Sequence, residues 1–367
     1  MSGTNSASIG EQIRITWAIA RKDIADAIKN KTTISIAVGV ALLMLSAQAM
    51  PLLLKLRSEP RAVYFDEGES VQMDGILKSR EVVLSKASSL EELESTLGES
   101  SGALLGLVIP ANFDQAAEVG EQIELDGFFV HFAGASDKTK AVAYFEQELS
   151  ERIGIAVKIN HEENIVYPGL ESDGQPFMVS LSMIVVILTI GALLVPILMM
   201  EEKEKHTMEA LMVSPASYSQ IVAGKAVAGL FYCITAAAVV LLMNFLMINL
   251  WGLALLAVLA GALFTVAIGL LLGTVLDNPV TLNLWLGVML IILLIPVFLA
   301  QVMGSRLPEA VSALIPWLPS MAMSKVLRIS FSRSFPLDAV LLNLAIIAGF
   351  AVVTLALVVW RVRRMDR

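Results

Sequence analysis

Six stretches of this chain each run for at least 22 residues without an Asp, Glu, Lys, Arg or His. About 20 apolar residues are enough for a helix to cross the hydrocarbon core of a bilayer. A backbone in lipid must satisfy its own hydrogen bonds, and these stretches lack the alternation of barrel strands. They therefore predict six transmembrane helices, at Thr33–Leu54, Phe177–Met200, Ala226–Ile248, Leu253–Leu276, Leu282–Met303 and Ala339–Trp360.

The composition fits a membrane protein, since 56% of the 367 residues are hydrophobic and only 16% are charged. That is too little charge to cover a water-facing surface. Thirty-two residues precede the first apolar stretch, which is long enough to remain as an anchor, so we expect no signal peptide. Cys233 is the only cysteine and lies inside the third stretch, which excludes an intrachain disulfide and predicts a buried structural thiol.

The Lys and Arg residues of the short loops predict the orientation in the membrane. One side carries twelve of them and the other seven, so both termini are expected in the cytoplasm. The twelve are Arg14, Arg21, Lys22, Lys29, Lys31, Lys203, Lys205, Lys225, Arg361, Arg363, Arg364 and Arg367, and the seven are Lys55, Arg57, Arg61, Arg306, Lys325, Arg328 and Arg333.

Residues 56–176, between the first two apolar stretches, are strongly acidic, with 23 acids against 9 bases. The same orientation places them outside the cytoplasm as a separate domain. The remainder of the chain is net basic, which suits a cytoplasmic surface facing anionic lipid. No basic patch with interleaved aromatic residues is present in the sequence, which argues against nucleic acid as a partner.

Strand-like runs alternate with helix-like pieces in residues 56–176, which predicts a small α/β domain. Ser89 followed by Glu92 is a capping box that opens a helix to about Leu97. A longer amphipathic helix is expected at Lys138–Ile159. The expected strands are Ala62–Phe65, Glu81–Leu84, Ala103–Ile109 and Phe128–Phe132.

The sequence of this domain does not point to an enzyme. His131 and His161 lack a metal-ligand spacing, and its carboxylates cannot be told from a solvated acidic surface. We expect a scaffold or a gate over an exit pathway, with no catalytic and no metal-binding residue.

The N-terminal segment, residues 1–32, is expected to form a cytoplasmic amphipathic helix. Its apolar residues recur every three or four positions, and Trp17 suits the depth of lipid headgroups. A simple topological anchor is the alternative. The apolar positions are Ile9, Ile13, Trp17, Ala20, Ile24 and Ile28.

A charged segment after the second span, residues 201–219, is the most informative part of the sequence, and we call it the elbow. As a helix it places Glu202 and Glu209 on one side and Leu211 on another. Ser214 and Pro215 fit the N-cap and first position of the helix that leads into the third span. Such a segment either docks on a soluble partner or forms a solvated loop.

The run EKEKHTMEALMVSPASYSQIVAGK resembles the cytoplasmic signature of type-2 ABC exporter permeases. The N-terminal ARKDIADAIKNKTT, the GLVIPANF stretch and the six spans extend this likeness over nearly the whole chain, closest to the subgroup with sodium and multidrug or lipopeptide export permeases. His206 departs from the pattern, where a glycine is common. The matching residues are Glu202, Glu204, Thr207, Glu209, Leu211, Ser214, Pro215, Gly224 and Lys225.

The resemblance implies an exporter powered by an ATPase on another chain, so that ATP and Mg bind the partner and no cofactor binds here. It implies a permease homodimer or heterodimer in a prokaryotic cell membrane. The elbow would be the helix that couples to the ATPase, through Glu202, Glu204, Thr207, Glu209, Leu211, Ser214 and Pro215. The turn at residues 277–279 would make a second contact.

Residues 304–337 resemble the short re-entrant helices that precede the last span in this family. Pro316 and Pro319 would interrupt a full crossing. An interfacial loop anchored by Trp317 is the alternative.

Two other classes of membrane protein fit the sequence less well. A secondary transporter or channel usually places ionisable groups at membrane depth, and the six stretches contain none. A membrane-anchored sensor would leave four of the helices unexplained. The apolar spans suit an amphiphilic substrate such as a lipid, drug or lipopeptide. The family resemblance leaves an ion such as sodium as an alternative substrate.

Overall fold

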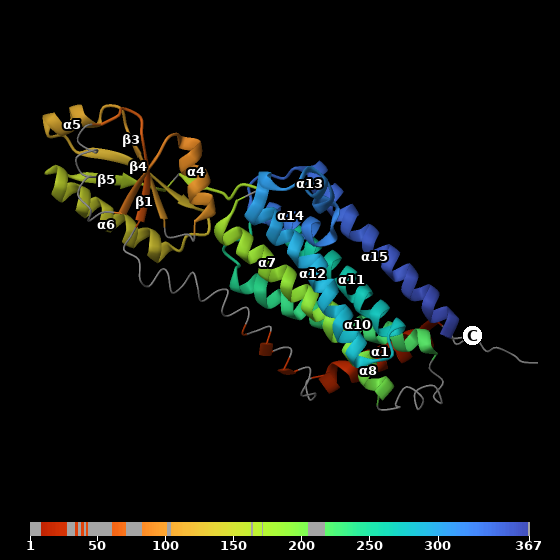
Figure 1. Cartoon of the computed structure of the whole chain (residues 1–367). Coiled ribbons are helices and arrows are strands. Elements are labelled where there is room, and N and C mark those ends of the chain that lie inside the picture. The colour runs from red at the N-terminus through yellow and green to blue at the C-terminus, as the bar shows by residue number, and fades with distance from the viewer. Residues whose placement is uncertain are drawn as a thin grey trace, which may run out of the picture.

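The computed structural model describes residues 9–27, 34–35, 38–39, 42, 61–70, 83–100, 104–162, 164–170, 172–204 and 217–365. These residues form a helical bundle with a sheet domain at one end (Figure 1). The first predicted span, Thr33–Leu54, lies almost entirely outside the described residues.

The bundle contains five helices that are long and apolar enough to cross a membrane, at the places of the other five predicted spans. The first of them continues from α7 through a π-helical turn, η1, into α8. The elements are α7 (Gly174–Thr189), η1 (Ile190–Leu194), α8 (Val195–Glu204), α10 (Tyr218–Met243), α11 (Trp251–Val275), α12 (Pro279–Met303) and α15 (Leu337–Met365).

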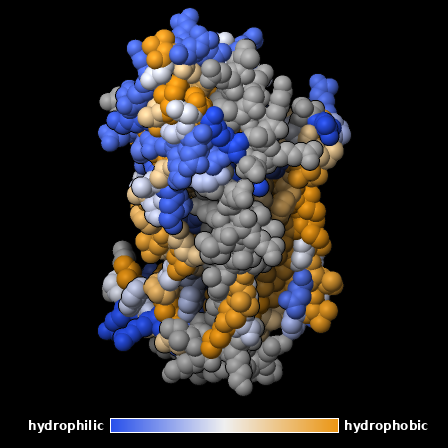
Figure 2. Space-filling view, turned by 90° about the vertical axis from the view of Figure 1, so that its left-hand side faces the viewer, coloured by the Kyte–Doolittle hydropathy of each residue, from blue (hydrophilic) through white to orange (hydrophobic). Residues whose placement is uncertain are grey.

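Burial divides these helices into a centre and a rim. In the most apolar stretch of the α7–α8 span 78% of the residues are buried, against 17% in α12. η1 and α11 cross closely because Gly191 and Gly269 have no side chain there, and a Cβ on Gly269 would lie 2.4 Å from the carbonyl oxygen of Gly191. Figure 2 shows apolar residues over the bundle and hydrophilic residues gathered at its two ends.

Residues 304–331 fold into a bent helix pair at the sheet-domain end of the bundle (Figure 1). Glu309–Trp317 and Pro319–Phe331 meet at 71°, with the bend at Leu318 between them. The predicted interruption by Pro316 and Pro319 is therefore confirmed, and the geometry fits a broken span or a re-entrant loop. The elements are η2 (Gly304–Arg306), α13 (Glu309–Leu314), η3 (Ile315–Trp317) and α14 (Pro319–Phe331).

The sheet domain holds a mixed sheet of six strands in the order β2-β1-β3-β4-β5, with β6 paired to β4. β3 and β4 are antiparallel, and the other pairs are parallel. The strands are β1 (Arg61–Asp66), β2 (Val83–Ala87), β3 (Leu104–Ile109), β4 (Ile123–Val130), β5 (Val157–Asn160) and β6 (Ile165–Val166), and the helices are α4 (Leu90–Glu99), α5 (Phe113–Val119) and α6 (Ala135–Ile153).

Both faces of this sheet are covered. Side chains alternate across a strand, so Val63 of β1 packs with Leu93 and Leu97 of α4, while Tyr64 packs with Phe145 of α6 on the opposite face. The α6 side of this core is continuous with the core of the helical bundle. The expected α/β character of the segment is thus present.

The predicted helix at Lys138–Ile159 is wrong at both ends. α6 begins at Ala135 and ends at Ile153, because Gly154 takes the left-handed conformation with φ at 80°. Residues 157–160 then form β5, in which buried and exposed side chains alternate. The predicted Ser89 cap is confirmed, since the Ser89 hydroxyl accepts a hydrogen bond from the Glu92 N–H.

Candidate functional site

The predicted coupling residues fall largely outside the described residues. Glu202 and Glu204 belong to the last turn of α8, whereas Thr207, Glu209, Leu211, Ser214 and Pro215 lie in residues 205–216, which the structure does not describe. The helices on either side of the elbow are described, and both belong to the end of the bundle far from the sheet domain (Figure 1).

The start of the helix after the elbow differs from the prediction of Ser214 and Pro215. α10 begins at Tyr218 and has Ser217 as its N-cap. The Ser217 hydroxyl accepts from the Gln220 N–H at 3.3 Å, and the Gln220 side chain accepts from the Ser217 N–H at 3.0 Å. This reciprocal capping box satisfies two backbone donors, which fixes the start of the helix.

A buried ion pair lies two turns into α10, and the sequence did not reveal it. The ammonium nitrogen of Lys225 is 3.3 Å from a carboxylate oxygen of Asp23 and 3.4 Å from the carbonyl oxygen of Leu198. Lys225 is 1% exposed and Asp23 is 6% exposed. Lys225 was counted among the twelve basic residues that predict the cytoplasmic side. Because it is buried, it does not add to the surface charge of that side.

Asp23 belongs to α1 (Ile9–Ala27), which packs along α10. The Tyr232 hydroxyl of α10 donates to the Ile24 carbonyl at 2.7 Å. Ala20 is fully buried, whereas Ile13 and Trp17 are 64% and 59% exposed. The predicted single apolar stripe is thus divided, since one part packs on the bundle and the other remains exposed for lipid.

The opposite end of the bundle is joined to the sheet domain by polar contacts. Nε2 of His131, just after β4, lies 2.9 Å from the carbonyl oxygen of Met247 in the α10–α11 loop. The His131 ring stacks on Tyr167 at 4.7 Å between ring centres. Arg328 of α14 donates to the carbonyl of Ser172 in the segment that leads into α7. We call this set of contacts the joint.

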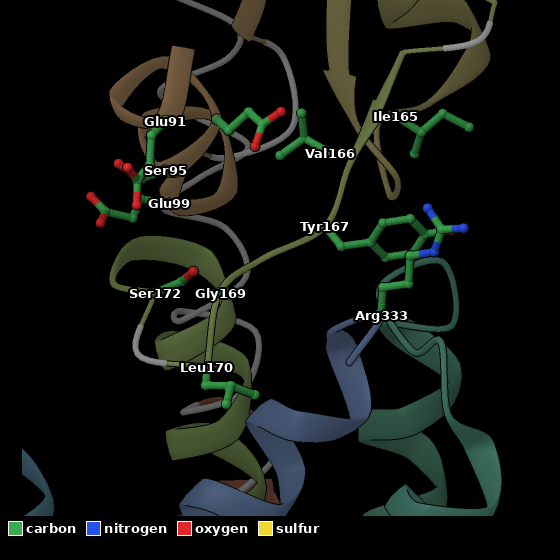
Figure 3. Close-up of a pocket in the computed structure, with 11 residues that line it drawn as sticks. Glu91, Ser95, Glu99, Ile165, Val166, Tyr167, Gly169, Leu170, Ser172 and Arg333 are labelled. Carbon is green, nitrogen blue, oxygen red and sulfur yellow. The ribbon is translucent and has the colours of Figure 1, made fainter. Parts of the chain in front are cut away.

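A cavity of about 800 Å³ opens beside the joint. Glu91, Ser95 and Glu99 of α4 line one wall (Figure 3). Tyr167 and Arg333 lie together on the other, with the guanidinium carbon 6.0 Å from the ring centre. Burial and the neighbouring acid Asp173 raise the pKa of Glu99.

Within the described residues, no group of three or more His, Cys, Asp or Glu residues is placed to hold a metal ion. His161 makes an edge-to-face contact with Phe129, and His131 is used in the joint. Cys233 is fully buried, and its Sγ is 3.9 Å from the Ile187 carbonyl oxygen.

The joint should loosen in acid. Burial, the largest cause, lowers the pKa of His131 from its ordinary 6.5; the Met247 hydrogen bond raises it and Lys138 lowers it further. The unfolded state then binds the proton more readily, so stability falls as pH drops below about 6.5 toward the lowered pKa. Hydrogen exchange of residues 164–173, corrected for the intrinsic pH dependence of amide exchange, should rise between about pH 7.5 and about pH 5.

The matched control is His131→Gln, whose amide can still donate to the Met247 carbonyl but does not titrate in this range. The other charged groups near the joint are Lys138, which lowers the His131 pKa, the two bases Arg328 and Arg333, and the acids Glu99 and Asp173 at the cavity. If His131→Gln shows the same rise as the wild type, the pH response comes from another group.

The sequence matches the ABC-2 family transporter proteins over residues 31–360. No curated protein and no solved structure matches significantly. The matched region contains the sheet domain, the elbow and the bent helix pair, and it includes the long apolar helices up to the last turn of α15. The chain is therefore a multi-pass membrane protein that belongs to the ABC-2 family of transporter proteins.

Proposed function

We propose that the chain is the permease subunit of an ATP-binding-cassette exporter that moves its substrate out of the cytoplasm. Family membership carries this proposal, because ABC-2 permeases are transport subunits that normally work with an ATPase subunit. The phosphate-binding pattern G-x-x-x-x-G-K-[ST] is absent from the sequence. The one Gly-Lys pair, Gly224-Lys225, lies inside α10, with Lys225 buried against Asp23.

The proposed complex contains two permeases and two ATPase subunits, with ATP and Mg on the ATPases. The exposed apolar face of α12 supports a second permease copy, since it includes Val280, Leu284 and Val288. The elbow residues Glu202, Glu204, Thr207, Glu209, Leu211, Ser214 and Pro215 would bind the ATPase. The turn before α12, where the Asn278 side chain caps the Val280 N–H at 2.8 Å, would add a smaller contact.

The substrate would be an amphiphile such as a lipid, drug or lipopeptide, or an ion as the resemblance implies. An apolar groove of about 570 Å³ between α12, the bent pair and α15 supports the amphiphile. Ile292, Leu314 and Trp317 line this groove. A photoreactive probe can be used to label the groove in the Trp317→Cys variant. Competition for this labelling by amphiphiles but not by sodium ions would indicate an amphiphilic substrate and not an ion.

Purification of the chain together with a candidate ABC ATPase, such as one encoded beside its gene, tests the proposal. We expect the chain alone neither to bind nor to hydrolyse ATP, because it has no phosphate-binding loop. Native mass spectrometry of the complex should give two permeases and two ATPases. ATP turnover by a permease preparation shown free of other ATPases, or an absence of any stable complex, would contradict the assignment.

The proposed orientation places α1, the elbow and the end of α15 in the cytoplasm and the sheet domain outside. The charge bias supports it, and α1 lies at the same end of the bundle as the end of α15 (Figure 1). Reporters fused at Gly98 and after Arg364 should therefore lie on opposite sides of the membrane. Reporters on the same side would refute this topology.

A further inference from the structure

Lys225 connects three elements that meet at the elbow end of the bundle. Its own helix, α10, begins at Tyr218 within the last residues of the elbow, and its ammonium group reaches Asp23 of α1. The same group donates to the carbonyl of Leu198 in α8, which runs into the elbow. One side chain therefore joins the helices at both ends of the elbow to the N-terminal helix.

The contacts around Lys225 are close enough to hold α1 in one place. Gly224 allows the approach, since a Cβ there would lie 2.7 Å from Cγ2 of Ile19 and 3.2 Å from the Thr16 carbonyl oxygen. The Tyr232 hydroxyl adds a hydrogen bond to the Ile24 carbonyl two turns further along. These contacts fix both the distance and the register between α1 and α10.

The burial of the pair makes it sensitive to the loss of either partner. A charge left alone in an apolar environment is strongly destabilising, whereas replacing both partners by apolar side chains is often tolerated. If α1 moved away from α10, Asp23 and Lys225 would have to separate inside the protein. The arrangement therefore favours α1 and α10 moving together.

We propose that Lys225 is a positioning residue that makes α1, the end of α8 and the start of α10 one rigid unit. Displacement of the elbow by the ATPase is then passed to α10 and α1 together. This inference rests on the proposed function, because it assigns a route for the force that the ATPase delivers. Lys225 acts through Asp23 and the Leu198 carbonyl and touches no substrate.

The first experiment measures whether Lys225 holds α1, and it needs no ATPase. In a Cys233→Ala background, Ile19→Cys and Gly224→Cys form a reporter disulfide, because the Cβ positions are 2.9 Å apart and a small shift gives disulfide geometry. Adding Lys225→Met should slow disulfide formation about tenfold. The Asp23→Leu/Lys225→Met double variant removes the pair without leaving an unpaired charge, and its rate should remain slow.

The second experiment tests transmission in the permease–ATPase complex. Hydrogen exchange is compared between the nucleotide-free and the ATP–vanadate state in residues 205–216 of the elbow and 319–331 of α14. With Lys225→Met we expect the nucleotide-dependent change in the elbow to persist and the change in α14 to be lost. Complete oxidation of the reporter disulfide between positions 19 and 224 should restore the nucleotide-dependent change in α14. Reduction of the disulfide should remove that change again.

A purely structural role would alter exchange in both nucleotide states and leave their difference unchanged. A normal α14 response in Lys225→Met, or a fully formed disulfide that does not restore it, would overturn the proposal. If Lys225→Met does not fold, the double variant replaces it, and a disulfide that forms there at the wild-type rate would overturn the proposal. A wild-type chain that binds no ATPase refutes the proposed function, and the disulfide rates still decide whether Lys225 holds α1.

Discussion

Leu211→Ala and Glu209→Lys should each detach the ATPase from the permease and abolish export. ATP-driven closure takes place in water while the substrate moves in lipid, so force must cross at a rigid contact. α8 supplies rigidity up to Glu204, and the capped start of α10 supplies it from Tyr218. Leu211 would insert as a buried anchor, and Glu209 would pair with a base of the ATPase groove.

The size of the effect follows from what buried interface residues contribute. Truncation of such a side chain typically costs about 2 kcal/mol or more, which is roughly thirtyfold in affinity. Co-purification of the tagged permease with the ATPase measures this loss directly. Insertion into the membrane should be unchanged, because neither residue lies in an apolar span.

Each elbow variant has a matched control elsewhere in the chain. Glu118→Lys makes the same charge reversal on an exposed residue of α5 in the sheet domain. Leu242→Ala makes the same truncation on α10, where Leu242 is exposed. Full ATPase binding and normal export by the elbow variants would show that the elbow is a solvated loop.

The membrane spans are the part of the fold that the sequence predicted best. Five of the six apolar stretches coincide with described helices, because a long uncharged segment in lipid has no other way to pair its backbone. Ends were less accurate: α10 extends back to Tyr218 and encloses Lys225. A charged residue such as Lys225 ends an apolar stretch in the sequence. In the structure the helix continues through it, because the charge is paired with a buried partner.

In the sheet domain, the error at Lys138–Ile159 has a local cause. Residues 157–160 are apolar at alternate positions, which is typical of a strand, and Gly154 supplies the helix stop. Both signals were present in the sequence, but the apolar spacing across the whole segment also fits a helix. A short apolar run can fit both the two-residue period of a strand and the 3.6-residue period of a helix.

The Asp23–Lys225 pair could not be predicted because its partners are 202 residues apart. One sign was available, since Asp23 lies three positions after Ala20 and beside Ile24, two members of the predicted apolar stripe. An acid within an apolar stripe requires a buried partner. The sequence alone does not say which of the bases supplies it.

Glycines pose a similar problem, since the sequence does not rank them by importance. Gly269 of α11 and Gly349 of α15 both lie inside apolar spans. In the structure, a Cβ on Gly349 would meet nothing within 4 Å, whereas one on Gly269 would meet the backbone of η1. Only the three-dimensional crossing separates a required glycine from an incidental one.

Gly269→Ala should therefore be among the most destabilising single-methyl changes in the bundle. The new Cβ would lie 2.4 Å from the Gly191 carbonyl oxygen and 3.1 Å from Cδ of Pro196, so the helices must separate. Overpacking of this kind costs roughly 1–3 kcal/mol. Gly349→Ala adds the same methyl where space is open and should be neutral or slightly stabilising, because Ala favours a helix over Gly by about 1 kcal/mol. The measurement is the midpoint of SDS-induced unfolding in mixed micelles, followed by circular dichroism. Equal midpoints for the two variants would mean that η1 and α11 do not cross through Gly191 and Gly269.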